Sequence, residues 1–136
     1  MTFIKSQESG SIQYPINTLK RASRAIRCLP FQLTLFTTMR SGSVPLPDIA
    51  GQKGFGYNYT RRPMSELAVE SGLMWLIQVG VLRREVDGQG ITDSFRLTPL
   101  GRQLVETWEH REGTVPPASF LDRLYNTLNR WSRLPV

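Results

Sequence analysis

The alternation of apolar and polar residues is most informative between Gly80 and Val105, which spans GVLRREVDGQGITDSFRLTPLGRQLV. Two strand-like runs, 82–86 and 95–97, flank an Asp-Gly turn sequence at 87–90, a combination typical of a β-hairpin. Thr98 and Pro99 follow at once. A threonine hydroxyl can cap free backbone N–H groups, and proline suits the first helical turn. The pattern therefore predicts a hairpin that leads directly into a helix ending near residue 111.

Apolar residues at three- and four-residue spacing predict further helices. These cover residues 16–29, 31–40, from 60 or 62 to about 79, and 118–133. The segment 31–40 also alternates like a strand, but Gly42 just beyond it favours a helix with a glycine cap. The intervening segments are predicted as a very short edge strand or extended linker at 44–47, one turn of helix at 48–50, and a glycine- and aromatic-rich loop at 51–63. For the helix that ends near 79, the predicted buried side consists of Met64, Leu67, Ala68, Leu73, Leu76 and Ile77.

These elements predict an α+β fold, mostly helical, with one β-hairpin and flanking N- and C-terminal helices. The 136 residues suit one folded unit. We divide the chain into a flexible arm (1–14), a main domain with an extra N-terminal helix (15–112) and a C-terminal helix (113–136).

The composition is that of an ordinary globular protein, with 40% hydrophobic and 21% charged residues. There is no apolar run of about 18 residues and the first residues lack a signal-peptide core, so we expect a cytoplasmic protein. Cys28 is the only cysteine, which excludes an internal disulfide and a cysteine cluster for zinc.

The net charge of +6 favours an anionic partner. Only three of the 17 basic residues are lysines, and no acid occurs between Glu8 and Asp48, where five basic residues fall. Arginine is the better side chain for bidentate contacts with phosphate and guanine. The charge therefore points to nucleic acid.

From about Phe31 to Trp108 the sequence resembles the winged-helix superfamily. The resemblance lies in LMWLIQVGVLRRE, the DGQG turn and FRLTPLGRQL. More narrowly, the whole chain is similar to a small family of cyanobacterial heterocyst-differentiation transcriptional regulators. This implies a winged helix-turn-helix transcription factor, dimeric, with the hairpin as wing. The loop between the second and third helices is longer than usual in the superfamily.

A recognition helix delivers its N-terminal residues to base edges in the major groove. Here the helix before the hairpin is expected to do so from Arg61 onward, with Glu66 either contacting a cytosine or pairing with Arg62. In the hairpin, alternation places Arg83 and Arg96 on one exposed face. The alternative is a solvated hairpin in which Glu85 pairs with Arg96. The predicted DNA-binding residues are Lys53, Tyr57, Asn58, Tyr59, Arg61, Arg62, Ser65, Arg83 and Arg96.

Two other segments invite a ligand-binding interpretation. Glycines beside Lys53 resemble a phosphate-binding loop, but no buried strand precedes them and Gly-Lys-Ser/Thr is absent. The basic helix at 16–29 could lie on an anionic membrane, but its apolar side is thin, so we expect that side to pack on the domain. Membrane binding is not expected.

The C-terminal helix carries Leu121, Leu124, Leu128 and Trp131 at coiled-coil spacing. Such a seam suits a two-fold dimer contact. The alternative is a helix packed on its own domain.

Residues for catalysis are sparse. His110 is the sole histidine, and no metal-ligand spacing is present. Cys28 fits a small core residue. We therefore expect no enzyme, no cofactor and no metal. The leading hypothesis is a homodimeric regulator that binds double-stranded DNA. The runner-up is a winged-helix protein-interaction adaptor without DNA binding, and a nucleotide-sensing glycine loop is a third, distant hypothesis.

Overall fold

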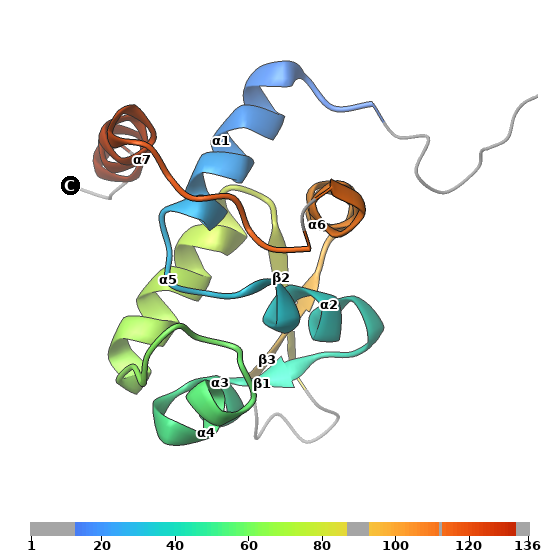
Figure 1. The fold of residues 1–136 in the computed structure, drawn as a ribbon, viewed down its shortest axis with the longest axis vertical. Coiled ribbons are helices and arrows are strands. Elements are labelled where there is room, and N and C mark those ends of the chain that lie inside the picture. The colour runs from blue at the N-terminus through green and yellow to red at the C-terminus, as the bar shows by residue number, and fades with distance from the viewer. Residues whose placement is uncertain (1–12, 87–92, 112, 133–136) are drawn as a thin grey trace, which may run out of the picture.

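The computed structural model describes residues 13–86, 93–111 and 113–132 and shows a mostly helical α+β fold (Figure 1). In chain order its elements are α1 (Ile16–Arg27), α2 (Leu33–Ser41), β1 (Val44–Pro45), α3 (Leu46–Ile49), α4 (Gly51–Gly56), α5 (Glu66–Gln78), β2 (Leu82–Val86), β3 (Asp93–Leu97), α6 (Pro99–Arg111) and α7 (Phe120–Ser132). The helices predicted at 16–29, 31–40, 98–111 and 118–133 are confirmed within a few residues, as are the short strand after Gly42 and the helical turn after it. The tip of the predicted hairpin, residues 87–92, lies outside the described residues, as do residues 1–12 of the predicted arm.

Within the described ranges the strands form one antiparallel sheet in the order β1-β3-β2. Arg83 lies opposite Arg96, and Val44 lies opposite Phe95. Because alternate side chains share a face, Leu82, Phe95 and Leu97 all point into the core. The predicted hairpin is therefore confirmed in both strands and in register.

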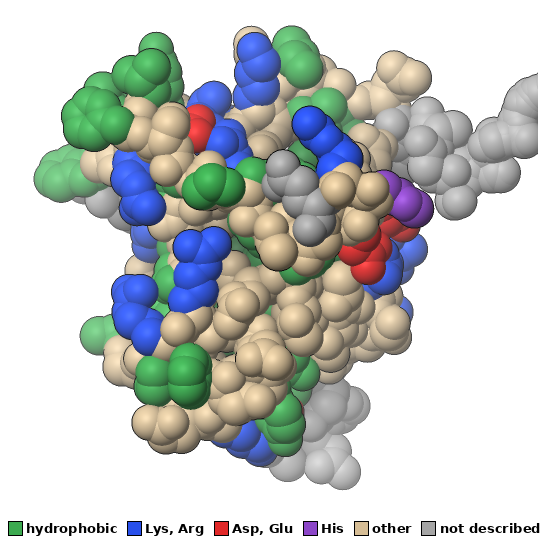
Figure 2. All heavy atoms as spheres, in the orientation of Figure 1, with side chains coloured by type: hydrophobic (Ala, Val, Ile, Leu, Met, Phe, Trp, Pro, Cys, Tyr) green, Lys and Arg blue, Asp and Glu red, His purple; other side chains and the backbone are tan. Residues whose placement is uncertain are grey.

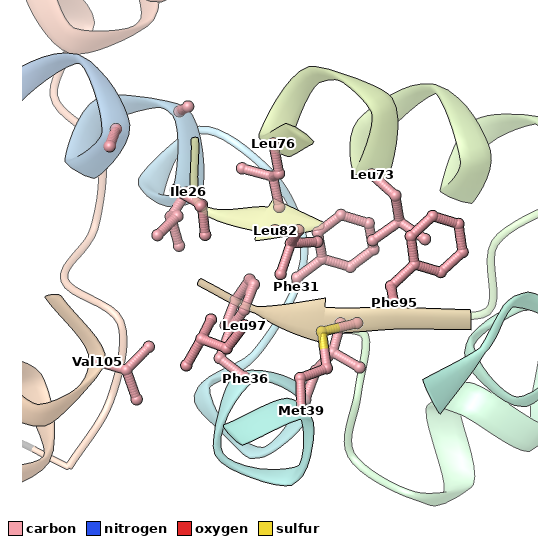
Figure 3. Packing of buried hydrophobic residues seen from close by; sticks show 14 of the residues in the cluster. Ile26, Phe31, Phe36, Met39, Leu73, Leu76, Leu82, Phe95, Leu97 and Val105 are labelled. Carbon is pink, nitrogen blue, oxygen red and sulfur yellow. The ribbon is translucent and has the colours of Figure 1, made fainter. Parts of the chain in front are cut away.

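The core lies between this face of the sheet and helices α1, α2 and α5 (Figure 3). Phe31 and Phe36 meet edge to face in it, with ring centroids 6.4 Å apart. Around them pack Met39 from α2 and Leu73 and Leu76 from α5. Residues from segments far apart in the chain thus share one apolar interior.

The entry into α6 follows the local chemistry of the sequence. The Thr98 hydroxyl accepts a hydrogen bond from the Gly101 N–H at 3.1 Å, which confirms the predicted cap. It also lies 2.5 Å from the Gly80 carbonyl, so the same side chain ties α6 to the end of α5. A Cβ at Gly101 would stand 2.5 Å from the Val81 carbonyl oxygen, so the helix approaches β2 closely only because this residue is glycine.

Two predictions about the middle of the chain are wrong. The first part of the predicted loop at 51–63 is helix α4. Its glycines suggested a loop, but Gly54 allows α4 to pack against α3, because a Cβ there would lie 1.7 Å from the Ile49 carbonyl oxygen. The next helix starts at Glu66 rather than at 60 or 62. Its buried side is confirmed only in part. Leu73 and Leu76 are buried as predicted, but Leu67 is 77% exposed, and Val69 and Trp75, which were not predicted, are buried.

Candidate nucleic-acid interface

The segment that leads into α5 is held in place by backbone hydrogen bonds to the residues before α2. The Gln32 N–H donates to the Tyr59 carbonyl at 2.9 Å, and the Arg61 N–H donates to the Pro30 carbonyl at 3.0 Å. Thr60, between them, is buried and pairs with Phe31 in an isolated bridge. The path of the chain on either side of Thr60 is therefore fixed by the core.

Four of the predicted DNA-binding residues are exposed on this segment. Tyr57 is half exposed, and its ring lies 5.3 Å from that of Tyr59, centroid to centroid. Asn58 adopts a left-handed backbone conformation with φ of 65°, which asparagine tolerates well. Arg61 and Arg62 are exposed. Tyr59 is half-buried against the core, so among the aromatic pair only Tyr57 is freely presented.

The two arginines do not lie where the sequence placed them. Because α5 begins at Glu66, Arg61 and Arg62 precede the helix instead of forming its first turn. Ser65 caps α5, and its hydroxyl accepts a hydrogen bond from the Ala68 N–H at 3.1 Å. The predicted contact of Ser65 with DNA would therefore compete with its role as the N-cap of α5. A serine just before the first helical residue is a typical N-cap, so the sequence could have indicated this role.

The solvent-facing side of α5 is acidic and apolar. Glu66 and Glu70 are exposed, as are Leu67 and Met74. Carboxylates on this side would repel phosphates. The cations nearest in sequence to its N-terminus, Arg61 and Arg62, stand outside the helix.

Lys53 is exposed on α4, but its ammonium is engaged. The Lys53 Nζ atom lies 2.7 Å from Asp48 Oδ1 on α3. This hydrogen bond raises the pKa of the Lys53 ammonium. A phosphate at this position would have to share Lys53 with Asp48.

On the hairpin, the two predicted arginines are cross-strand neighbours with different surroundings. Arg83 has an exposed side chain and pairs with Glu85 on the same face at 3.1 Å. Arg96 is half-buried rather than exposed, and its Nε atom is buried without a hydrogen-bond partner within the described segments. In place of the Glu85–Arg96 pair of the alternative interpretation, the structure has a Glu85–Arg83 pair. Arg84, which was not predicted as a site residue, lies over the Phe95 ring and contacts the Met74 sulfur at 3.1 Å.

The predicted site residues are divided between two parts of the molecule. Arg83 and Arg96 lie opposite each other near the start of β2 and the end of β3, where the hairpin joins α5 and α6. The lower end of Figure 1 holds helices α3 and α4, the start of α5, and the ends of β2 and β3 that flank residues 87–92. Helices α1 and α7 lie at the upper end. Lys and Arg side chains are spread down the side that carries α7 and α5 (Figure 2). On the same face, acidic side chains show mainly beside α6.

The basic helix α1 packs on the domain as predicted, with Ala22, Ala25 and Ile26 buried. Its arginines have a role that the sequence did not reveal. Arg27 donates two hydrogen bonds to Asp122 of α7, at 2.5 and 3.2 Å, and Arg24 lies over the Tyr125 ring. Nothing in the local pattern of either helix indicates this pairing.

The predicted dimer residues Leu121, Leu124, Leu128 and Trp131 all lie on the solvent-exposed side of α7, with exposed fractions from 44% to 71%. The helix nevertheless packs on its own domain, through its polar residues. The packing of α7 on its own domain is thus confirmed, and the dimer contact through its exposed side stays a prediction.

Within the described residues, no group of three or more His, Cys, Asp or Glu side chains is placed to hold a metal ion. No helix in those ranges is long and apolar enough to cross a membrane. His110 is exposed at the end of α6. Burial raises the pKa of the Cys28 thiol, which keeps it protonated and makes it a poor nucleophile.

Comparison with known proteins assigns the chain to a family. The Npun_F0494-like family model matches residues 12–130, which include every helix and strand apart from the last two residues of α7. The chain belongs to the Npun_F0494-like family. No curated protein and no solved structure matches it.

Proposed function

We propose that this Npun_F0494-like protein is a winged-helix DNA-binding regulator. The observation that carries the proposal is the order and pairing of the elements from α2 to β3. A helix, a short strand, a helical corner, a long helix and a hairpin follow one another, and β1 pairs with the second strand of the hairpin. This is the arrangement expected of a winged helix, with α5 as the third helix and β2–β3 as the wing.

The contacts we propose are mainly with the phosphate backbone. Arg61 and Arg62 stand exposed before the N-terminus of α5, where the helix dipole also favours an anion. Tyr57 and Asn58 add hydrogen-bonding groups on the same segment, and Arg83 adds a cation on the hairpin. Because the exposed side of α5 carries Glu66 and Glu70, we place direct base contacts in the segment 57–62 rather than along the helix.

Regulation of transcription, and the kinship with heterocyst-differentiation regulators, rest on the sequence resemblance. A second candidate function, a protein-interaction adaptor, is favoured by the exposed Leu67 and Met74 on α5. Apolar side chains beside carboxylates on a helix suit a protein partner better than DNA.

Fluorescence anisotropy with mixed-sequence duplex DNA over a salt series tests the proposal. Affinity should fall with salt by a slope of roughly 0.9 per neutralised phosphate, and Arg61→Ala with Arg62→Ala should lower that slope by roughly 2. Arg102→Ala with Arg111→Ala removes the same charge from exposed positions on α6 and serves as the control. Absence of binding at low salt would reject DNA binding, and equal losses in both double variants would reject the site.

A further inference from the structure

Helix α7 is attached to the domain by a polar stripe. Every fourth residue along it bonds to the body of the protein. Asp122 accepts from Arg27 of α1, Asn126 accepts from the Trp75 indole of α5 at 2.9 Å, and Arg130 donates to the Ser71 hydroxyl at 2.7 Å. The side of α7 that faces the protein is thus the side an amphipathic helix normally turns to water.

The opposite side of α7 is apolar and exposed. It presents large side chains at three- and four-residue spacing, visible as the hydrophobic group at the upper left of Figure 2. These residues, with their exposed fractions, are Phe120 (78%), Leu121 (59%), Leu124 (44%), Tyr125 (53%), Leu128 (57%) and Trp131 (71%).

The size of this surface indicates what covers it. Since an aromatic side chain can bury roughly 150–250 Å², the exposed parts of Phe120, Tyr125 and Trp131 alone correspond to roughly 300–500 Å², and three leucines add to this area. A typical monomer exposes at most roughly 300–600 Å² in one patch, whereas each partner in a stable interface buries roughly 800 Å². The rim is polar, with Arg24 lying over the Tyr125 ring, as at the edge of a protein interface.

We propose that this apolar face of α7 binds the same face of a second copy of the chain. Leu121, Leu124, Leu128 and Trp131 form a heptad-like seam, which is self-complementary about a two-fold axis. The polar stripe holds α7 rigidly against α1 and α5, so the seam is already formed before two copies meet. Helix α7 lies at the opposite end of the molecule from α3 and α4 (Figure 1), and it contacts α5 at Ser71 and Trp75 rather than at the segment 57–62.

Self-association is tested without DNA, so its outcome is independent of the DNA-binding proposal. Sedimentation of the full chain over a concentration series should give twice the chain mass. Leu124→Glu with Leu128→Glu should give a monomer with an unchanged circular dichroism spectrum, since both side chains are exposed. Leu67→Glu places one such charge at an exposed leucine of α5 and should remain dimeric.

Three outcomes would overturn the proposal. The first is a wild-type chain that stays monomeric throughout the series. The second is a Leu124→Glu, Leu128→Glu variant that remains dimeric. The third is a monomeric chain that floats with phosphatidylglycerol-containing vesicles and loses this binding in the double variant, because the face would then be a lipid-binding surface.

Discussion

The Trp75 indole N–H donates to the Asn126 side-chain oxygen at 2.9 Å, and this buried bond joins α5 to α7. Both residues are almost fully buried, with 3% and 8% of their surface exposed. Asn126 is the middle residue of the polar stripe, so the bond shows that the contact of α7 with the domain is specific and desolvated.

Replacing Asn126 by Ala should destabilise the protein by about 1–3 kcal/mol, because the Trp75 N–H is left buried without a partner. Urea denaturation followed by circular dichroism measures the change. Thr127→Ala, at the exposed neighbouring position, should change stability by less than about 0.5 kcal/mol. An equal effect of both substitutions would show that the bond contributes nothing.

The attachment of α7 should weaken in acid. The backbone N–H of Ser119, with the Arg27 guanidinium and the Ser119 hydroxyl, lowers the pKa of the Asp122 carboxyl below its ordinary value of 3.8. A lowered pKa in the folded state means that the stabilisation is complete above pH 3.8 and is lost as the pH falls through the lower, folded value. The free energy of unfolding should therefore fall as the pH is lowered through 3.8 and below.

Asp122→Asn is the control for this pH effect. It keeps the shape of the side chain and removes its titration, so the variant should be less stable near neutral pH and lose less stability on acidification. Glu109, whose pKa is also lowered by its hydrogen bond to Arg40, titrates in both proteins. An identical acid dependence of wild type and variant would contradict a role for Asp122.

Gly54 should not accept a side chain. An alanine Cβ there would stand 1.7 Å from the Ile49 carbonyl oxygen, so the corner between α3 and α4 would have to open. We expect Gly54→Ala to lower the free energy of unfolding by at least about 2 kcal/mol. Gly56→Ala, at the end of the same helix with nothing within 4 Å of its Cβ, should be neutral or stabilising by up to about 1 kcal/mol. Thermal unfolding of the two variants measures the difference. Similar melting temperatures would contradict the close approach of Gly54 to the Ile49 carbonyl.

Removing the partner of Arg83 should strengthen DNA binding if the hairpin contacts phosphate. Glu85 pairs with Arg83 at 3.1 Å, so Glu85→Gln frees the guanidinium and removes a repulsive charge. The affinity for duplex DNA at low salt should rise by about 1.5- to fivefold, the range of a single exposed charge contact. Glu106→Gln on α6 removes the same charge from another exposed position. Weaker or unchanged binding in Glu85→Gln would remove Arg83 from the interface.

Local chemistry was a reliable guide where a few neighbouring residues set the conformation. The strand alternation around Arg83 and Arg96 and the cap at Thr98 were both predicted and found. The glycine-rich segment 51–56 was wrongly predicted as a loop, because the close contact that requires Gly54 involves a carbonyl in the preceding helix. The start of α5 was misplaced because Thr60 is held by Phe31, a partner distant in sequence.

The sequence by itself determined that the last helix is amphipathic, that the hairpin joins α6 through a threonine cap, and that the chain carries an excess of arginine. The first two properties depend on residues within one or two turns of each other, and the third on composition alone. Only the tertiary structure decided which side of α7 faces the protein. Arg27 and Asp122 are 95 positions apart in the chain. A partly buried charged pair between residues so far apart leaves no trace in local periodicity. The apolar seam of α7 could therefore be located from the sequence, but its exposure could not.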